Sequence, residues 1–94
     1  MRADEVEVRN PSGLHARPAA LFVKAAARFA STITVQNMTK GAAPANAKSI
    51  LAVMASGAAR GHTVRIAAEG PDEDAAIAAL HDLVVSGLGE VLEA

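Results

Sequence analysis

The chain has 94 residues and a mass of 9.5 kDa, the size of one small domain spanning residues 1–94. It has no cysteine, which excludes disulfide frameworks and cysteine nucleophiles, and its nine basic and ten acidic residues lack the basic excess of a nucleic-acid-binding domain. Alanine accounts for 23 residues, and only Phe22 and Phe29 are aromatic, so we expect a thin core under closely packed helices.

We expect neither a membrane span nor an export signal in this sequence. No stretch approaches the ~20 apolar residues of a membrane span. Residues 1–10 alternate charges and lack the apolar region of a secretory signal. We therefore expect a cytoplasmic protein that inserts into no membrane.

The first ten residues predict a strand that runs into a turn. Residues 5–9 alternate, with Val6 and Val8 on one side and charged residues on the other, which is typical of a half-buried strand. The turn-forming residues 10–13 (NPSG) end this strand.

A helix is predicted from Ala16 to Ala30. Apolar residues recur there at helical spacing, and Pro18 fits only the first turn, where its missing N–H is not needed. Lys24 and Arg28 fall outside the apolar stripe, which indicates a solvated face of the helix.

The middle of the chain predicts a strand, an edge strand and a short helix. Residues 32–36 (TITVQ) alternate and are rich in β-branched side chains, as a strand requires. Residues 39–43 are predicted to form a short edge strand that Pro44 terminates. Residues 48–56 carry apolar residues at mixed spacing before two glycines, which favours a short helix.

The last third predicts one more strand and a long helix. Residues 63–67 (TVRIA) alternate, and acidic residues after Gly70 suit the first turn of a helix because of the helix dipole. The apolar stripe of that helix is formed by Ala76, Ile77, Leu80, Leu83, Val84 and Leu88. The order β-α-β-β-α-β-α predicts an α+β fold with three helices covering one face of a four-stranded antiparallel sheet, and the alternating strands leave the other face wet.

Residues 10–20 (NPSGLHARPAA) place His15 where a turn meets a helix, with Arg17 two residues on. A helix start offers unpaired N–H groups and a partial positive charge, and an arginine adds a planar fork of donors suited to phosphate. Both disfavour an imidazolium, so we expect a neutral, nucleophilic ring near pH 7. Such a nucleophile beside an anion cradle can accept a phosphoryl group. The spacing alone also fits a histidine that merely caps the helix beside an exposed arginine.

This segment resembles the active-site motif of the HPr family, the histidine-containing phosphocarriers of the bacterial sugar phosphotransferase system. Residues 46–54 (NAKSILAVM) resemble that family's regulatory serine motif, and the likeness runs from about residue 5 to residue 90. The resemblance implies an open-faced sandwich of four strands under three helices. It also implies that His15 is the phosphoryl acceptor and that Arg17 holds the phosphate.

The resemblance implies partners as well. The family takes its phosphoryl group from enzyme I, which obtains it from phosphoenolpyruvate, and passes it to sugar-specific enzyme IIA domains. The docking residues would be Ala20, Lys24, Ile50, Leu51 and Met54. From the residues alone the apolar members could instead belong to the core; we expect that of the neighbouring Val53, and the docking role of Leu51. We expect a monomer that needs no cofactor or metal.

Ser49 fits two roles. A serine before an apolar run is an ordinary helix N-cap. The resemblance adds phosphorylation by the ATP-dependent HPr kinase/phosphorylase of many bacteria. The two are compatible because a phosphate is electrostatically favourable at a helix N-terminus, and it would place about two negative charges beside the docking residues.

The chain departs from the family between its second strand and the serine motif. Residues 37–46 (NMTKGAAPAN) are about three residues longer than the family's usual hairpin, which bears on the edge strand and its turn. His62 and His81 have no partner at metal-ligand spacing and are interpreted as surface structure.

Three other functions fit the sequence less well. A hydrolase using His15 as general base would need a nucleophile and an acid partner that the segment lacks. A regulatory relative of HPr would keep the serine and lose the histidine. An RNA-binding domain would place stacking aromatics on its sheet, whereas both phenylalanines fall in the predicted first helix.

Overall fold

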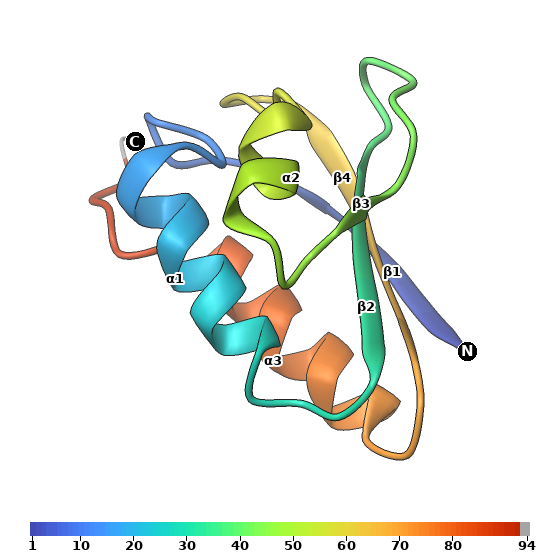
Figure 1. Ribbon diagram of the computed structural model, residues 1–94. Coiled ribbons are helices and arrows are strands. Elements are labelled where there is room, and N and C mark those ends of the chain that lie inside the picture. Colours follow the sequence, from blue (N-terminus) through green and yellow to red (C-terminus); the bar gives the residue numbers. More distant parts are fainter. Residues whose placement is uncertain (93–94) are drawn as a thin grey trace.

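The computed structural model describes residues 1–92 and follows the predicted element order (Figure 1). The elements are β1 (Arg2–Glu7), α1 (Ala16–Ala26), β2 (Thr32–Asn37), β3 (Ala45–Asn46), α2 (Ile50–Ala55), β4 (Thr63–Glu69) and α3 (Glu73–Val85).

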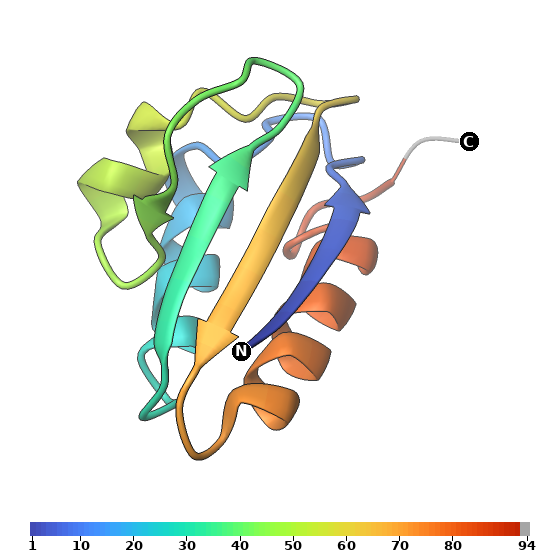
Figure 2. The ribbon, with the colours of Figure 1, turned by 90° about the vertical axis from the view of Figure 1, so that its right-hand side faces the viewer.

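The four strands form one antiparallel sheet in the order β1-β4-β2-β3. All three helices lie on one face, and Figure 2 looks onto the other face, which no helix covers. The register pairs Val6 with Val64 and Val35 with Ile66, so the buried faces of neighbouring strands coincide. The predicted α+β open-faced sandwich is confirmed.

The core is thin because alanines occupy many of its helical positions. Ala19, Ala26 and Ala76 are fully buried, which lets α1 and α3 approach closely. Among the described residues, Phe22 of α1 has the largest fully buried side chain. It belongs to the same core cluster as the buried residues of the strands. In the predicted stripe of α3, Leu83 is only partly buried and Leu88 lies beyond the helix end, yet Leu88 is completely covered.

The predicted edge strand at residues 39–43 is wrong. Those residues lie in a tight connection closed by hydrogen bonds from Gly41 N to Met38 O (3.3 Å) and from Ala42 N to Asn37 O (3.1 Å). The strand β3 comes after Pro44 and pairs Ala45 with Val35. Since proline has no N–H to donate, it precedes this edge strand rather than ending it.

Other boundaries shift in ways that local hydrogen bonding explains. Helix α1 ends at Ala26 rather than Ala30 because the next residues turn more tightly: Arg28 N donates to Ala25 O and Phe29 N to Ala26 O, each at 3.2 Å. Strand β1 begins at Arg2, earlier than predicted, and Val8 stays buried beyond its end.

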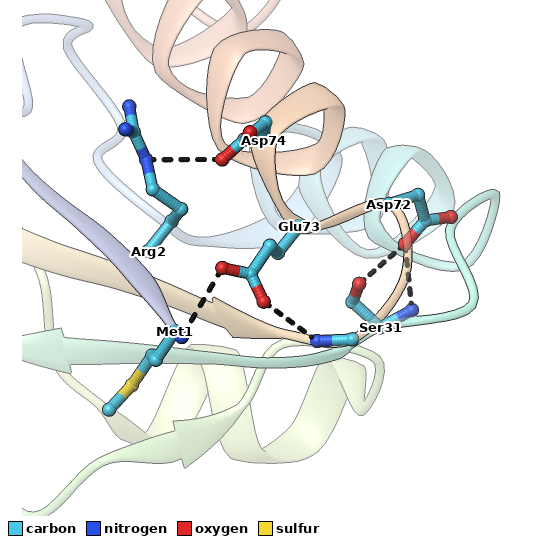
Figure 3. Close-up of polar contacts among 7 residues, drawn as sticks. Met1, Arg2, Ser31, Asp72, Glu73 and Asp74 are labelled. Atoms are coloured by element: carbon cyan, nitrogen blue, oxygen red, sulfur yellow. Dashed lines mark hydrogen bonds and ion pairs between the residues drawn. The ribbon is translucent and has the colours of Figure 1, made fainter.

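The carboxylate of Asp72 connects the turn before α3 to the turn between α1 and β2. Asp72 at the start of α3 accepts hydrogen bonds from Ser31 N (3.0 Å) and the Ser31 hydroxyl, which Figure 3 shows. It also accepts one from Ala30 N at 2.8 Å. Beside it, Glu73 accepts a hydrogen bond from Gly70 N at 3.1 Å and lies 3.2 Å from the Met1 amine. Donors from the α1–β2 turn, with the Ser31 hydroxyl first, hold the pKa of Asp72 below its ordinary value.

We predict that Asp72→Asn lowers the free energy of unfolding at pH 7. Because the folded-state pKa of Asp72 is depressed, its contribution is complete above the ordinary value of 3.8 and is lost as the pH falls through the folded value. Urea unfolding at a series of pH values should show the two proteins converging in acid. Asp82→Asn, an exposed change on the same helix, serves as the control. An equal loss in both variants would contradict the role of Asp72.

Candidate functional site

His15 stands at the N-cap of α1 with its side chain exposed. Its backbone is extended (φ −136°, ψ 153°), and its ring makes no capping hydrogen bond. His15 therefore occupies the capping position of the helix, but its side chain does not cap it. The ring is left open to solvent at the end of the helix where N–H groups are unpaired.

The first turn of α1 is suited to an anion. It contains Arg17, which is exposed, and no acidic residue. The helix dipole and the unpaired N–H groups add positive potential at the same end. Pro18 is buried in this turn, where its missing N–H leaves no bond unmade. The structure thus places the two predicted site residues, His15 and Arg17, in one exposed turn.

Ala16 has a left-handed backbone, with φ +50°, between these two residues. For alanine this conformation costs roughly 1–2 kcal/mol. Such strain persists only where the surrounding structure holds it in place. Nothing in the sequence signals it, because an alanine between two functional residues carries no mark of its backbone angle.

The turn before His15 is held from both sides. Fully buried Asn10 donates from Nδ2 to Gly13 O at 2.9 Å, and Leu14 N donates to Ala58 O at 2.9 Å. Gly13 has φ +63° and lies so close to the chain after α2 that a Cβ there would come within 2.4 Å of Ala58 O. The requirement for glycine at this position is therefore both conformational and steric.

Glu90, which no motif of the sequence marks, also holds this turn. Its Oε1 accepts hydrogen bonds from Asn10 Nδ2 (2.9 Å) and Ser12 N (3.0 Å), and its Oε2 accepts one from Ser12 Oγ (2.8 Å). These donors, Asn10 first, hold the pKa of Glu90 below its ordinary value. The contact spans 78 residues or more of sequence, so no local pattern could have revealed it.

The residues predicted for docking divide according to their burial. Leu51 is 78% exposed and Ile50 41%, Met54 is partly buried, and Val53 is completely buried as expected of a core residue. Ala20 and Lys24 are exposed on α1, which packs beside α2 (Figure 1). The exposed members of the predicted docking set are therefore divided between α1 and α2, two helices that pack against each other.

Ser49 is the N-cap of α2, and its Oγ accepts a hydrogen bond from Ala52 N at 3.2 Å. The structural role predicted for this serine is confirmed. The side chain remains partly exposed.

The other two histidines each contact another residue of the fold. His62 Nδ1 accepts a hydrogen bond from Ala59 N at 3.1 Å, and His81 Nδ1 lies 2.8 Å from Asp4 Oδ2. Within residues 1–92, no group of three histidine or carboxylate side chains is placed to hold a metal ion, and no helix is long and apolar enough to cross a membrane.

The described chain is thus an open-faced α+β sandwich that exposes a histidine and an arginine at the start of its first helix. Residues 3–86 match the family model described as the PTS HPr component phosphorylation site. The chain belongs to the HPr family.

The relatives agree with this assignment. The chain is 47% identical over 78 residues to the phosphocarrier protein HPr of Treponema pallidum, covering 83% of this chain and 85% of that protein. It is similar in structure to HPr from Thermoanaerobacter tengcongensis, with a TM-score of 0.90, 47% identity, and coverage of 98% and 100%. It is also 43% identical over 86 residues to the multiphosphoryl transfer protein of Salmonella typhimurium, covering 92% of this chain but only 23% of that longer protein.

We predict that Gly13→Ala destabilises the fold more than Gly41→Ala. Both glycines have nearly the same backbone angle (φ +63° and +64°), but a Cβ at Gly41 meets nothing within 4 Å. Strain alone should cost Gly41→Ala on the order of 1 kcal/mol, whereas the added clash raises the cost at Gly13 to roughly 2–4 kcal/mol. Urea unfolding measures both. Equal losses would show that the loop after α2 yields without cost.

Proposed function

We propose that this chain carries a phosphoryl group on His15 within a bacterial sugar phosphotransferase system. The observation that supports this most directly is the exposed ring of His15 at the N-terminus of α1, in a chain of the HPr family. The ring makes no capping hydrogen bond. The protein is then a covalent carrier between other proteins, rather than an enzyme that turns over a small substrate.

The transfer requires little chemistry from the carrier itself. A nitrogen of the His15 ring attacks the phosphorus of phosphorylated enzyme I; the new P–N bond forms as the bond to the donor breaks. The charge of the three phosphoryl oxygens is met by Arg17 and by the N–H groups at the start of α1. Because the transition state of phosphoryl transfer is loose, positioning and charge neutralisation supply most of the catalysis. The reverse displacement passes the group to an enzyme IIA domain.

The proposed docking surface consists of Ala20 and Lys24 on α1 with Ile50, Leu51 and Met54 on α2. Its apolar residues, together with the exposed cations Lys24 and Arg17 of α1, suit a partner with an apolar patch and an acidic rim. We propose that enzyme I and the enzyme IIA domains use this one surface in turn. The protein would act as a cytoplasmic monomer without a cofactor.

Ser49 gives this surface a means of regulation. Its hydroxyl is partly exposed at the N-cap of α2, next to Ile50 and Leu51. Phosphorylation by an HPr kinase/phosphorylase would add about two negative charges at a helix N-terminus, which tolerates them. Those charges would oppose docking of an acidic partner without unfolding the helix.

We predict that His15→Ala abolishes labelling by enzyme I and phosphoenolpyruvate, while the far-ultraviolet circular dichroism is unchanged because the ring makes no capping bond. Intact mass measurement would show the added phosphoryl group in the wild type, and acid should remove it, as expected for a P–N bond. His81→Gln is the control and should label normally. Labelling that persists in His15→Ala would remove His15 from this role.

We predict that Ser49→Asp weakens binding to enzyme I by about tenfold, the size of one charge–charge interaction near a protein surface. Ser49→Asn is the matched control, since asparagine also caps a helix but adds no charge. Calorimetric titration of enzyme I with each variant provides the affinities. If the aspartate and asparagine variants bind alike, the docking surface lies elsewhere.

A further inference from the structure

The segment after α3 is built to bring Glu90 back onto the turn before His15. Three consecutive residues have left-handed backbones: Gly87 (φ +97°), Leu88 (φ +52°) and Gly89 (φ +82°). Leu88 is fully buried and anchors the segment in the core, and Glu90 N donates to Gly87 O at 2.9 Å to close it. We call residues 86–90 the strap.

The strap fits closely against α1. A Cβ on Gly89 would come within 2.8 Å of Leu21 Cδ1, so the chain passes over α1 where only glycine fits without displacing that side chain. Non-glycine residues rarely adopt the angle seen at Leu88, and its buried side chain compensates for the strain. The position of Glu90 is thus fixed by packing, not by its own hydrogen bonds alone.

Hydrogen bonds connect Glu90 to the backbone that carries the reactive ring. Glu90 holds both Asn10 and Ser12, and the same Asn10 amide nitrogen that reaches Glu90 also donates to Gly13 O. Gly13 is two residues from His15. The His15 side chain has no capping bond of its own, so the ring is placed by this backbone and by strained Ala16.

We propose that Glu90 is a positioning residue for phosphoryl transfer: its carboxylate locks the turn of residues 10–13 so that the His15 ring and the first N–H groups of α1 meet the phosphoryl group together. This inference rests on the proposed function, since it concerns the rate at which His15 accepts the phosphoryl group. It leaves the docking surface on α1 and α2 unaltered.

The test is the rate of phosphorylation by phosphorylated enzyme I as a function of carrier concentration. Glu90→Ala should lower kcat by on the order of tenfold or more, because small misplacements of reacting groups carry penalties of that size. Its KM should stay within about twofold of the wild type if docking is independent of the strap. Glu69→Ala, an exposed glutamate at the end of β4, should leave both constants unchanged.

Glu90→Gln provides the rescue. Its amide oxygen can accept from Asn10 Nδ2 and Ser12 N, and its amide nitrogen can donate to Ser12 Oγ, so it should recover most of the lost kcat. A role that depends only on negative charge would leave Glu90→Gln as slow as Glu90→Ala. Ser12→Ala removes a single bond and should give a smaller loss, which keeps the test valid if Glu90→Ala unfolds.

A second measurement separates this inference from the proposed function. Amide hydrogen exchange of residues 12–16 should be faster in Glu90→Ala than in the wild type, whether or not His15 is phosphorylated. A wild type that enzyme I cannot label would refute the proposed function alone. An unchanged kcat in Glu90→Ala, a change confined to KM, or unaltered exchange would refute the positioning role of Glu90.

Discussion

The contact between the start of α1 and the chain after α2 determines how the site is presented. Leu14 N donates to Ala58 O, and Gly13 lies against the same residue with no space for a side chain. This contact holds the histidine turn against the loop that leaves α2. Helices α1 and α2 therefore pack against each other, with the start of α1 beside the chain that leaves α2.

Helix α3 supports this arrangement from both of its ends. Asp72 at its start gathers the donors of the α1–β2 turn, and Glu90 beyond its end gathers those of the turn before α1. Two carboxylates near opposite ends of α3 thus fasten the two ends of α1. With an alanine-rich core that offers few large side chains, such polar attachments fix what packing alone would leave loose.

Local patterns predicted most of the fold because the strands alternate and the helices carry apolar stripes. They failed at residues 37–46, where the edge strand is only two residues long and proline marks its beginning rather than its end. The placement of His15 and Arg17 in one exposed turn was predictable from the motif and from the physics of a helix start. The hydrogen bonds of Glu90 were not, because they join segments distant in sequence. The left-handed angle of Ala16 was not either, because nothing in the residue type marks it.

The small size of α2 has a dynamic consequence. This helix has six residues, and Val53 is its one fully buried side chain, so its attachment to the core is far slighter than that of α1 or α3. Short helices with few buried contacts open locally at low free energy. The hydrogen bond from Ala52 N to Ser49 Oγ then contributes a large share of the free energy that keeps α2 folded. Any change that removes the Ser49 cap therefore favours a locally unfolded α2.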